Sequence, residues 1–115
     1  MAYNEKLTNR VRAALAQVTN VEEKKMFGGI AFMVNEKMCI TVGDDEIMCR
    51  LDQALHNTVL KKEGCRPVIM RGREYKGFVY VNEEAVKSKK DFDYWIALSL
   101  DFNKTAKSSK KKKKN

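Results

Sequence analysis

Apolar residues recur at helical spacing in three segments of the chain. The first segment runs from Leu7 to Val18 with steps of three or four residues, which predicts an amphipathic helix over about residues 5–19. The second segment follows Asp52, and the third covers about residues 89–103. Residues whose side chains can cap a helix precede all three segments: Asn4, Asp52 and Ser88.

Continuous or alternating apolar runs predict five strands. They cover about residues 26–34, 37–42, 47–51, 67–70 and 75–81. Gly28 and Gly29 fall inside the first run, where they indicate a β-bulge or a close approach of two backbones. The resulting order is helix, three strands, helix, two strands, helix. This order predicts an α+β fold with two layers, an antiparallel five-stranded sheet with helices packed on it.

The net charge of the chain is concentrated at its C-terminal end. The 115 residues suit one domain, and the 43% hydrophobic share supports a packed core. The formal charge is +8, but residues 104–115 hold seven lysines and no acid. Residues 1–103 are almost neutral, with sixteen basic and fifteen acidic side chains. We therefore expect a domain over residues 1–103 and a lysine-rich, disordered tail over residues 104–115.

The sequence favours a cytoplasmic protein without a membrane partner. No apolar stretch approaches the roughly 18 residues of a membrane-spanning helix, and the N-terminus does not resemble a secretory signal. The three cysteines, Cys39, Cys49 and Cys65, contain no C-x-x-C pair, and the chain has one histidine. These counts argue against a disulfide framework or a zinc site, so we expect reduced thiols.

The sequence predicts no catalytic, cofactor-binding or metal-binding residues. Catalysis needs a nucleophile with a base, paired carboxylates or a metal cluster. His56 is the one candidate imidazole base, and its position among Leu55 and Asn57 predicts a histidine on a helix surface. Cys39 and Cys49 are expected in the core. A three-residue turn at Gly43 would place these thiols opposite each other, whereas a two-residue turn would not.

A basic segment over residues 61–76 is the best candidate surface for nucleic acid. It holds six basic and two acidic residues, and Tyr75, Phe78 and Tyr80 lie in or just beyond it. Basic side chains beside aromatic ones can bind phosphate and stack on bases. A solvated loop whose aromatic residues belong to the core is the favoured alternative, because these aromatic residues alternate as strand residues do. The candidate residues are Arg66, Arg71, Arg73 and Lys76 in the domain, with Lys110, Lys111, Lys112, Lys113 and Lys114 in the tail.

The lysine-rich tail has two interpretations. It can contact nucleic acid loosely and without sequence preference through counterion release, or it can serve as a solubilising segment with no dedicated partner.

Several strings of residues resemble those of one known family. Residues 25–33 read Lys-Met-Phe-Gly-Gly-Ile-Ala-Phe-Met, and residues 76–81 read Lys-Gly-Phe-Val-Tyr-Val. Residues 37–40 read Lys-Met-Cys-Ile, and residues 94–96 read Tyr-Trp-Ile. Taken in their order along the chain, with Arg66-Pro67 before residues 76–81, the strings resemble the N-terminal domain of the TfoX/Sxy family over residues 5–103.

The resemblance implies a two-layer α/β domain with a link to gene regulation. Full-length TfoX/Sxy proteins are positive regulators of natural competence genes that act with the cyclic-AMP receptor protein at promoters. They carry a second, C-terminal domain, at whose position we expect the lysine-rich tail in this sequence. The family supplies no catalytic residues. Its motif residues imply structural roles: Gly28, Gly29 and Gly77 in backbone geometry, and Phe27, Phe32, Phe78 and Trp95 in packing.

These observations predict a non-enzymatic interaction domain that acts in transcriptional regulation through a protein partner. The tail would add weak contact with nucleic acid. The alternatives are direct nucleic-acid binding through residues 61–76 and the tail, and a small enzyme or ligand binder without a recognisable motif. A homodimer would form if a second copy covered an open sheet edge or an apolar helix face.

Overall fold

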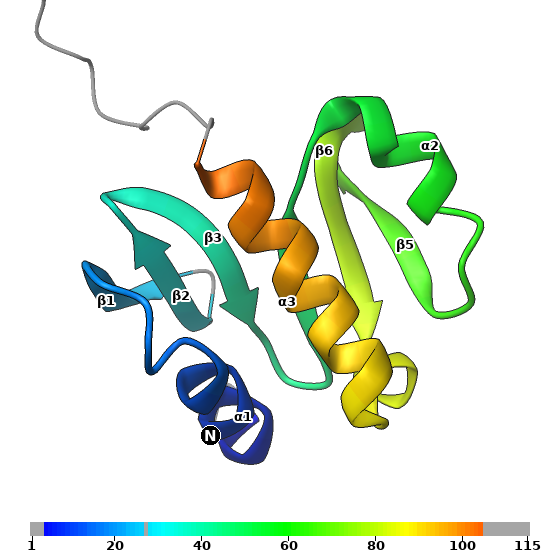
Figure 1. Ribbon diagram of the computed structural model, residues 1–115. Coiled ribbons are helices and arrows are strands. Elements are labelled where there is room, and N and C mark those ends of the chain that lie inside the picture. Colours follow the sequence, from blue (N-terminus) through cyan, green and yellow to red (C-terminus); the bar gives the residue numbers. More distant parts are fainter. Residues whose placement is uncertain (1–3, 27, 105–115) are drawn as a thin grey trace, which may run out of the picture.

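Helices and strands of this chain form two layers, with α1 and α3 packed on one face of an antiparallel sheet (Figure 1). The computed structural model describes residues 4–26 and 28–104. The strands are β1 (Val21–Met26), β2 (Gly29–Val34), β3 (Lys37–Val42), β4 (Glu46–Arg50), β5 (Cys65–Met70) and β6 (Arg73–Asn82), in the spatial order β1-β2-β3-β4-β6-β5. The helices are α1 (Glu5–Ala14), α2 (His56–Val59) and α3 (Lys89–Asn103), with 3-10 turns at Gln53–Leu55 and Glu83–Val86. The predicted α+β class is confirmed.

The predicted caps begin two of the helices. The side chain of Asn4 accepts a hydrogen bond from the Leu7 N–H at 2.9 Å, and Oγ of Ser88 accepts one from the Asp91 N–H at 3.1 Å. Helix α1 ends at Ala14, earlier than the predicted residue 19. The apolar side chains of Leu15 and Val18 still pack on the core, but they do so from turns that lead the chain into β1.

The sheet has six strands among the described residues, one more than the five predicted. Residues 21–34 form the β1–β2 hairpin, in which Met26 lies opposite Gly29 and Gly28 has a φ of +73°. Gly28 therefore lies in a turn and not in a bulge, and Gly29 begins β2. The sequence pattern missed β1 because residues 22–25 are all charged, as suits a strand at the edge of a sheet.

Gly29 is required by a close approach of two strands. A Cβ atom at this position would lie 2.0 Å from the carbonyl oxygen of Val42 on β3. Any larger residue would force β2 and β3 apart at this end of the sheet.

A β-bulge lies at Cys39 in β3. Phe32 is opposite Ile40 and Met33 is opposite Met38, so Cys39 is the extra residue on its strand. Across the next pair of strands, Ile40 lies opposite Cys49. The two thiols are therefore not cross-strand partners, and all three cysteines of the chain are free.

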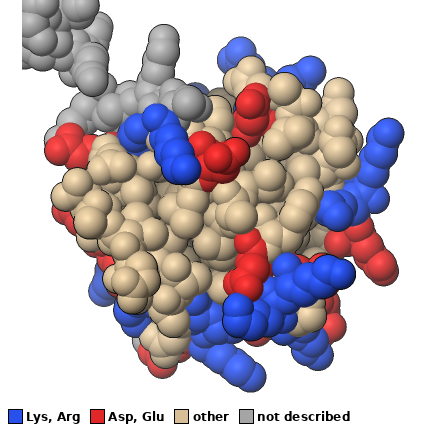
Figure 2. All heavy atoms as spheres, in the orientation of Figure 1, with Lys and Arg blue, Asp and Glu red and all other residues tan. Residues whose placement is uncertain are grey.

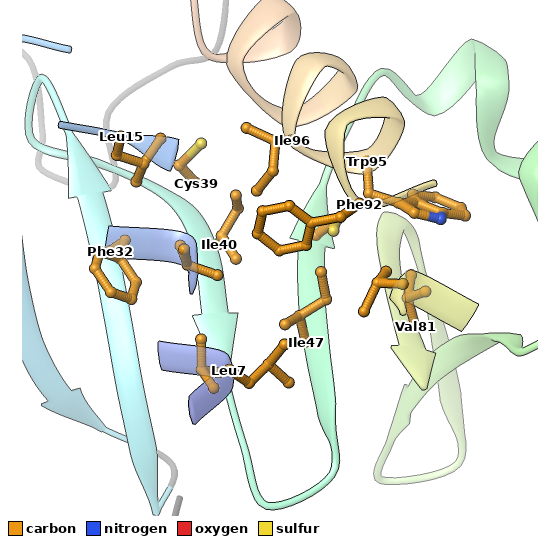
Figure 3. Packing of buried hydrophobic residues seen from close by; sticks show 14 of the residues in the cluster. Leu7, Leu15, Phe32, Cys39, Ile40, Ile47, Val81, Phe92, Trp95 and Ile96 are labelled. Carbon is orange, nitrogen blue, oxygen red and sulfur yellow. The ribbon is translucent and has the colours of Figure 1, made fainter. Parts of the chain in front are cut away.

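The core lies between the sheet and the two longer helices (Figure 3). Leu7 from α1 and Phe92 and Ile96 from α3 pack on strand residues such as Phe32 and Ile40. Each such side chain contributes about 1.5–3 kcal/mol when fully buried. Because α1 and α3 pack on the same face, no described helix covers the other face of the sheet. We call this other side the helix-free face.

That second face is also apolar at its centre. A row of cross-strand partners crosses five strands there: Ala31, Thr41, Met48, Tyr80 and Arg66. The neighbouring row points the opposite way, into the helix-covered core, because successive strand residues alternate between faces. Ala31 and Met48 are buried although they lie outside the core cluster.

Candidate interaction surface

Three of the four predicted basic residues of the domain lie together at one end of the molecule. Strands β5 and β6 form a hairpin in which Met70 lies opposite Arg73, so Arg71 and Gly72 make the turn. Arg71 adopts a φ of 54°, which directs the chain sharply back on itself. Arg71, Arg73 and Lys76 are all exposed. The hairpin therefore carries three cationic side chains within six residues.

Arg66 lies apart from this group. Its guanidinium forms an ion pair with Glu46 of β4 and stands 5.1 Å from the centre of the Tyr80 ring. These contacts hold Arg66 across the helix-free face of the sheet. Its side chain covers Tyr80 and does not extend the basic group of the hairpin.

Large apolar side chains are exposed beside the three cations. The described chain exposes five large hydrophobic residues, and three of them belong to this hairpin: Ile69 at 59%, Met70 at 40% and Tyr75 at 39%. We call the six residues Ile69, Met70, Arg71, Arg73, Tyr75 and Lys76 the hairpin surface. Exposed apolar side chains with cations beside them are typical of a site that binds another macromolecule.

A shallow groove continues from the hairpin surface onto the helix-free face of the sheet. It has a volume of about 230 Å³, and Met70, Met48 and Tyr80 supply much of its lining. Thr41 and Glu46 complete its polar side. Methionine side chains adapt their shape readily, so a groove of this composition can accept an apolar group from a partner.

His56 binds the base of the hairpin from a buried position, and the prediction of a surface histidine is wrong. His56 is 1% exposed and does not lie on the helix surface as predicted. The 3-10 turn before α2 rotates this short helix, so that Leu55 is exposed and His56 points inward. No spacing in the sequence signalled this arrangement.

Both ring nitrogens of His56 are occupied. Nδ1 accepts the N–H of Gly77 at 3.0 Å, so Nε2 carries the proton and donates to Oε2 of Glu74 at 2.7 Å. Gly77 has a φ of +91°, and its carbonyl oxygen accepts from the Leu51 N–H at 2.8 Å. The imidazole has no free nitrogen for proton transfer, and its role is to join α2 to β6.

The cysteines are protected as thiols. Burial raises the pKa of Cys39 to about 12, an effect that Arg50 partly offsets, and burial also raises the pKa of Cys49 to about 12. The less buried Cys65 has its pKa raised by burial to about 11. Because the thiolate is the nucleophile, none of these groups is activated for covalent chemistry at neutral pH.

A second hollow, of about 660 Å³, lies between α3 and the chain around Gly64. Its lining includes Lys62, Glu63 and Asp91 but neither His56 nor a cysteine. The ammonium of Lys62 stands 4.6 Å from the centre of the Tyr94 ring, and both residues line this hollow. In residues 4–26 and 28–104, no three His, Cys, Asp or Glu side chains come together as metal ligands would.

The predicted motif residues occupy structural positions where they are described. Phe32 and Trp95 are buried, and Phe78 is half-buried with the Arg50 guanidinium 5.7 Å from its ring centre. Phe27 and the predicted tail lysines beyond Lys104 lie outside the described residues. Figure 2 shows both signs of charge along the margins of the α3 face, with uncharged side chains over much of its centre.

Comparison with known proteins identified one family. The family model described as the TfoX N-terminal domain matches residues 13–103 of the 115 residues. No curated protein and no solved structure matched the chain. In the part of the chain that the structure describes, no helix is long and apolar enough to cross a membrane.

Proposed function

Because this chain belongs to the TfoX N-terminal domain family, we propose that it is a non-enzymatic interaction domain that acts in transcriptional regulation by binding a protein partner. The family is not a known enzyme family, and membership of it suggests a regulatory role related to competence. The proposal places the domain in the cytoplasm, where its three free cysteines stay reduced.

The observation that carries this proposal is the composition of the hairpin surface. Residues 69–75 expose three large apolar side chains, and residues 71–76 hold three cations and one acid, Glu74. Glu74 accepts a hydrogen bond from His56 and forms no ion pair with Arg71 or Arg73 among the described residues. A partner that fits this surface presents apolar side chains flanked by acidic ones.

A matched pair of tyrosines tests the proposal. Tyr75 lies on the hairpin surface and Tyr94 lies on α3, and they are almost equally exposed, at 39% and 38%. The full chain is used to capture proteins from native lysate under nuclease treatment, and the captured protein is then purified and its affinity measured. Tyr75→Ser is expected to weaken binding by about tenfold, since an aromatic anchor at an interface typically contributes over 1 kcal/mol, whereas Tyr94→Ser retains wild-type binding.

The outcome that contradicts the proposal is equally specific. If the protein captured nothing after nuclease treatment, or bound only through contacts that moderate salt removes, a dedicated protein partner would be rejected. Equal losses from the two tyrosine variants would place the interface elsewhere.

Direct nucleic-acid binding is the second candidate function. Its supporting observation is Arg73, whose guanidinium stands 6.0 Å from the ring centre of exposed Tyr75. A stacking platform needs several open rings, but Arg66 covers Tyr80 and Phe78 is half-buried. One open aromatic residue supports this function less well than the three exposed apolar side chains of the hairpin support protein binding.

A further inference from the structure

Strand β1 ends the sheet on the side opposite the hairpin surface. In the strand order β1-β2-β3-β4-β6-β5, β1 and β5 are the two edges. Strand β5 contains Pro67, which has no N–H to offer a further strand. Strand β1 has no proline, and no described strand pairs with its outer side. It is therefore the edge better suited to accept another strand.

The register of the β1–β2 hairpin shows which backbone groups face outward. The N–H of Asn35 donates to the carbonyl of Asn20 at 3.0 Å, and these residues continue the register of the two strands. Along an antiparallel strand, residues whose N–H and C=O face the partner strand alternate with residues whose N–H and C=O face away from it. Asn20 faces β2, so Val21 and every second residue after it face outward. The outward groups of β1 are therefore those of Val21, Glu23 and Lys25.

The side chains of β1 carry a charge order that complements itself. Residues 22–25 read Glu-Glu-Lys-Lys, and all four are exposed. Two copies paired antiparallel in one sheet are related by a two-fold axis normal to the sheet, which keeps every side chain on its own face. With the axis at Glu23, Glu22 lies opposite Lys24 of the second copy, and Lys24 lies opposite Glu22 of the second copy.

Both faces of this pairing are electrostatically consistent. The two Glu22–Lys24 pairs lie on the helix-free face, and neither residue has an ion pair with another described residue. The two Glu23 residues meet on the helix-covered face, where Arg12 holds each carboxylate at 2.7 Å. An axis at Lys24 would instead oppose two lysines and leave fewer outward backbone groups paired.

We propose that two copies of this chain associate through their β1 strands, antiparallel about an axis at Glu23, to form one continuous sheet. A row of like charges on an edge strand would repel a second copy of that strand in every register. The mixed order in β1 instead brings opposite charges together when the axis lies at Glu23. The association leaves both hairpin surfaces free, because they lie at the far edges of the joined sheet.

Charge exchange tests the pairing by sedimentation equilibrium of the full chain at low salt. The wild-type chain is expected to dimerise reversibly. Lys24→Glu opposes two carboxylates in both pairs and is expected to weaken dimerisation by about tenfold. The double variant E22K/K24E restores opposite charges and is expected to recover wild-type dimerisation. Lys25→Glu is the register control, because Lys25 lies opposite Val21 and its change has a small effect.

A monomeric wild-type chain at high micromolar concentration would overturn the proposal. So would failure of E22K/K24E to recover dimerisation while its thermal unfolding matches that of the wild-type chain. A loss for Lys25→Glu as large as that for Lys24→Glu would reject this register.

Amide hydrogen exchange supplies a measurement that does not depend on charge. With rising protein concentration, the outward amides of Val21, Glu23 and Lys25 are expected to exchange more slowly, while those of Glu22 and Lys24, which already face β2, stay unchanged. Protection at Ile69 instead would assign self-association to the hairpin surface. R71E/R73E is expected to leave dimerisation unchanged even where it abolishes partner binding, so the two proposals fail separately.

Discussion

His56 and Glu74, which are separated by 18 residues in the chain, meet at 2.7 Å between Nε2 and a carboxylate oxygen. The same imidazole accepts the N–H of Gly77 through Nδ1. One buried side chain thus fixes α2 against β6 at the base of the hairpin surface. Tyr75 lies between these two partners of His56 in the sequence.

Replacement of His56 is expected to destabilise the fold more than replacement of its partner. His56→Ala leaves a cavity and an unsatisfied backbone N–H at Gly77, which together cost about 3 kcal/mol. Glu74→Gln keeps an oxygen that can accept from Nε2, so the expected cost is under about 1 kcal/mol. Urea unfolding measures both. Equal losses would show that the carboxylate charge, and not the imidazole, holds the hairpin.

Any side chain at Gly77 is expected to destabilise the fold. The φ of +91° at this position strains any other residue, and a Cβ atom would lie 3.0 Å from the carbonyl oxygen of Leu51. Gly77→Ala should therefore lower the free energy of unfolding by about 2–3 kcal/mol. Gly72→Ala is the matched control, with a φ of +74° and no atom within 4 Å of the added Cβ. Its expected cost is about 1 kcal/mol, and a cost equal to that of Gly77→Ala would exclude the steric contribution.

The thiols are expected to titrate only in strongly alkaline solution. The pKa values of Cys39 and Cys49 are raised from 9.0 to about 12 by burial. The unfolded chain therefore releases these protons first, so stability is complete below pH 9 and falls as the pH rises towards 12. The double variant C39A/C49A should show a weaker loss over this range in urea unfolding. An identical pH dependence in both proteins would contradict this assignment.

Thiol-labelling rates should follow the same order. At pH 8, Cys65 is expected to react with an aromatic disulfide reagent before the other two, because it is the least buried and its pKa is raised only to about 11. Cys39 and Cys49 should react at the rate of unfolding. Mass spectrometry of partly labelled protein identifies the order, and early labelling of Cys49 would show that the core opens locally.

Nucleic-acid affinity is expected to depend on the terminal lysines more than on the hairpin arginines. Deletion of Lys110 to Lys114 should reduce the dependence of log affinity on log salt by about 4.5, since each of five phosphate contacts contributes about 0.9. R71A/R73A should change it little. Fluorescence anisotropy with a short DNA duplex measures both. A larger loss from R71A/R73A would instead favour direct recognition by the hairpin surface.

Local chemistry made parts of the candidate surface predictable. Arg71, Arg73 and Lys76 lie within six residues of one hairpin, with Arg71 in its two-residue turn, so their proximity follows from the sequence. The contact of Arg66 with Glu46 was not predictable, because Glu46 lies 20 residues away and only the strand order brings the two side chains together. The exposure of Ile69 was not predictable, since an edge strand and a buried strand can share the same apolar pattern.

Sequence periodicity and capping side chains alone determined the α+β class, the position of α3 and the cap at Ser88. These features depend on contacts within a few residues, which the sequence displays directly. Tertiary structure decided the sixth strand, the burial of His56 and the pairing of Arg66 with Glu46. Each of these depends on which distant segments lie side by side, and a charged edge strand or a single inward-facing imidazole gains its stability only from such neighbours.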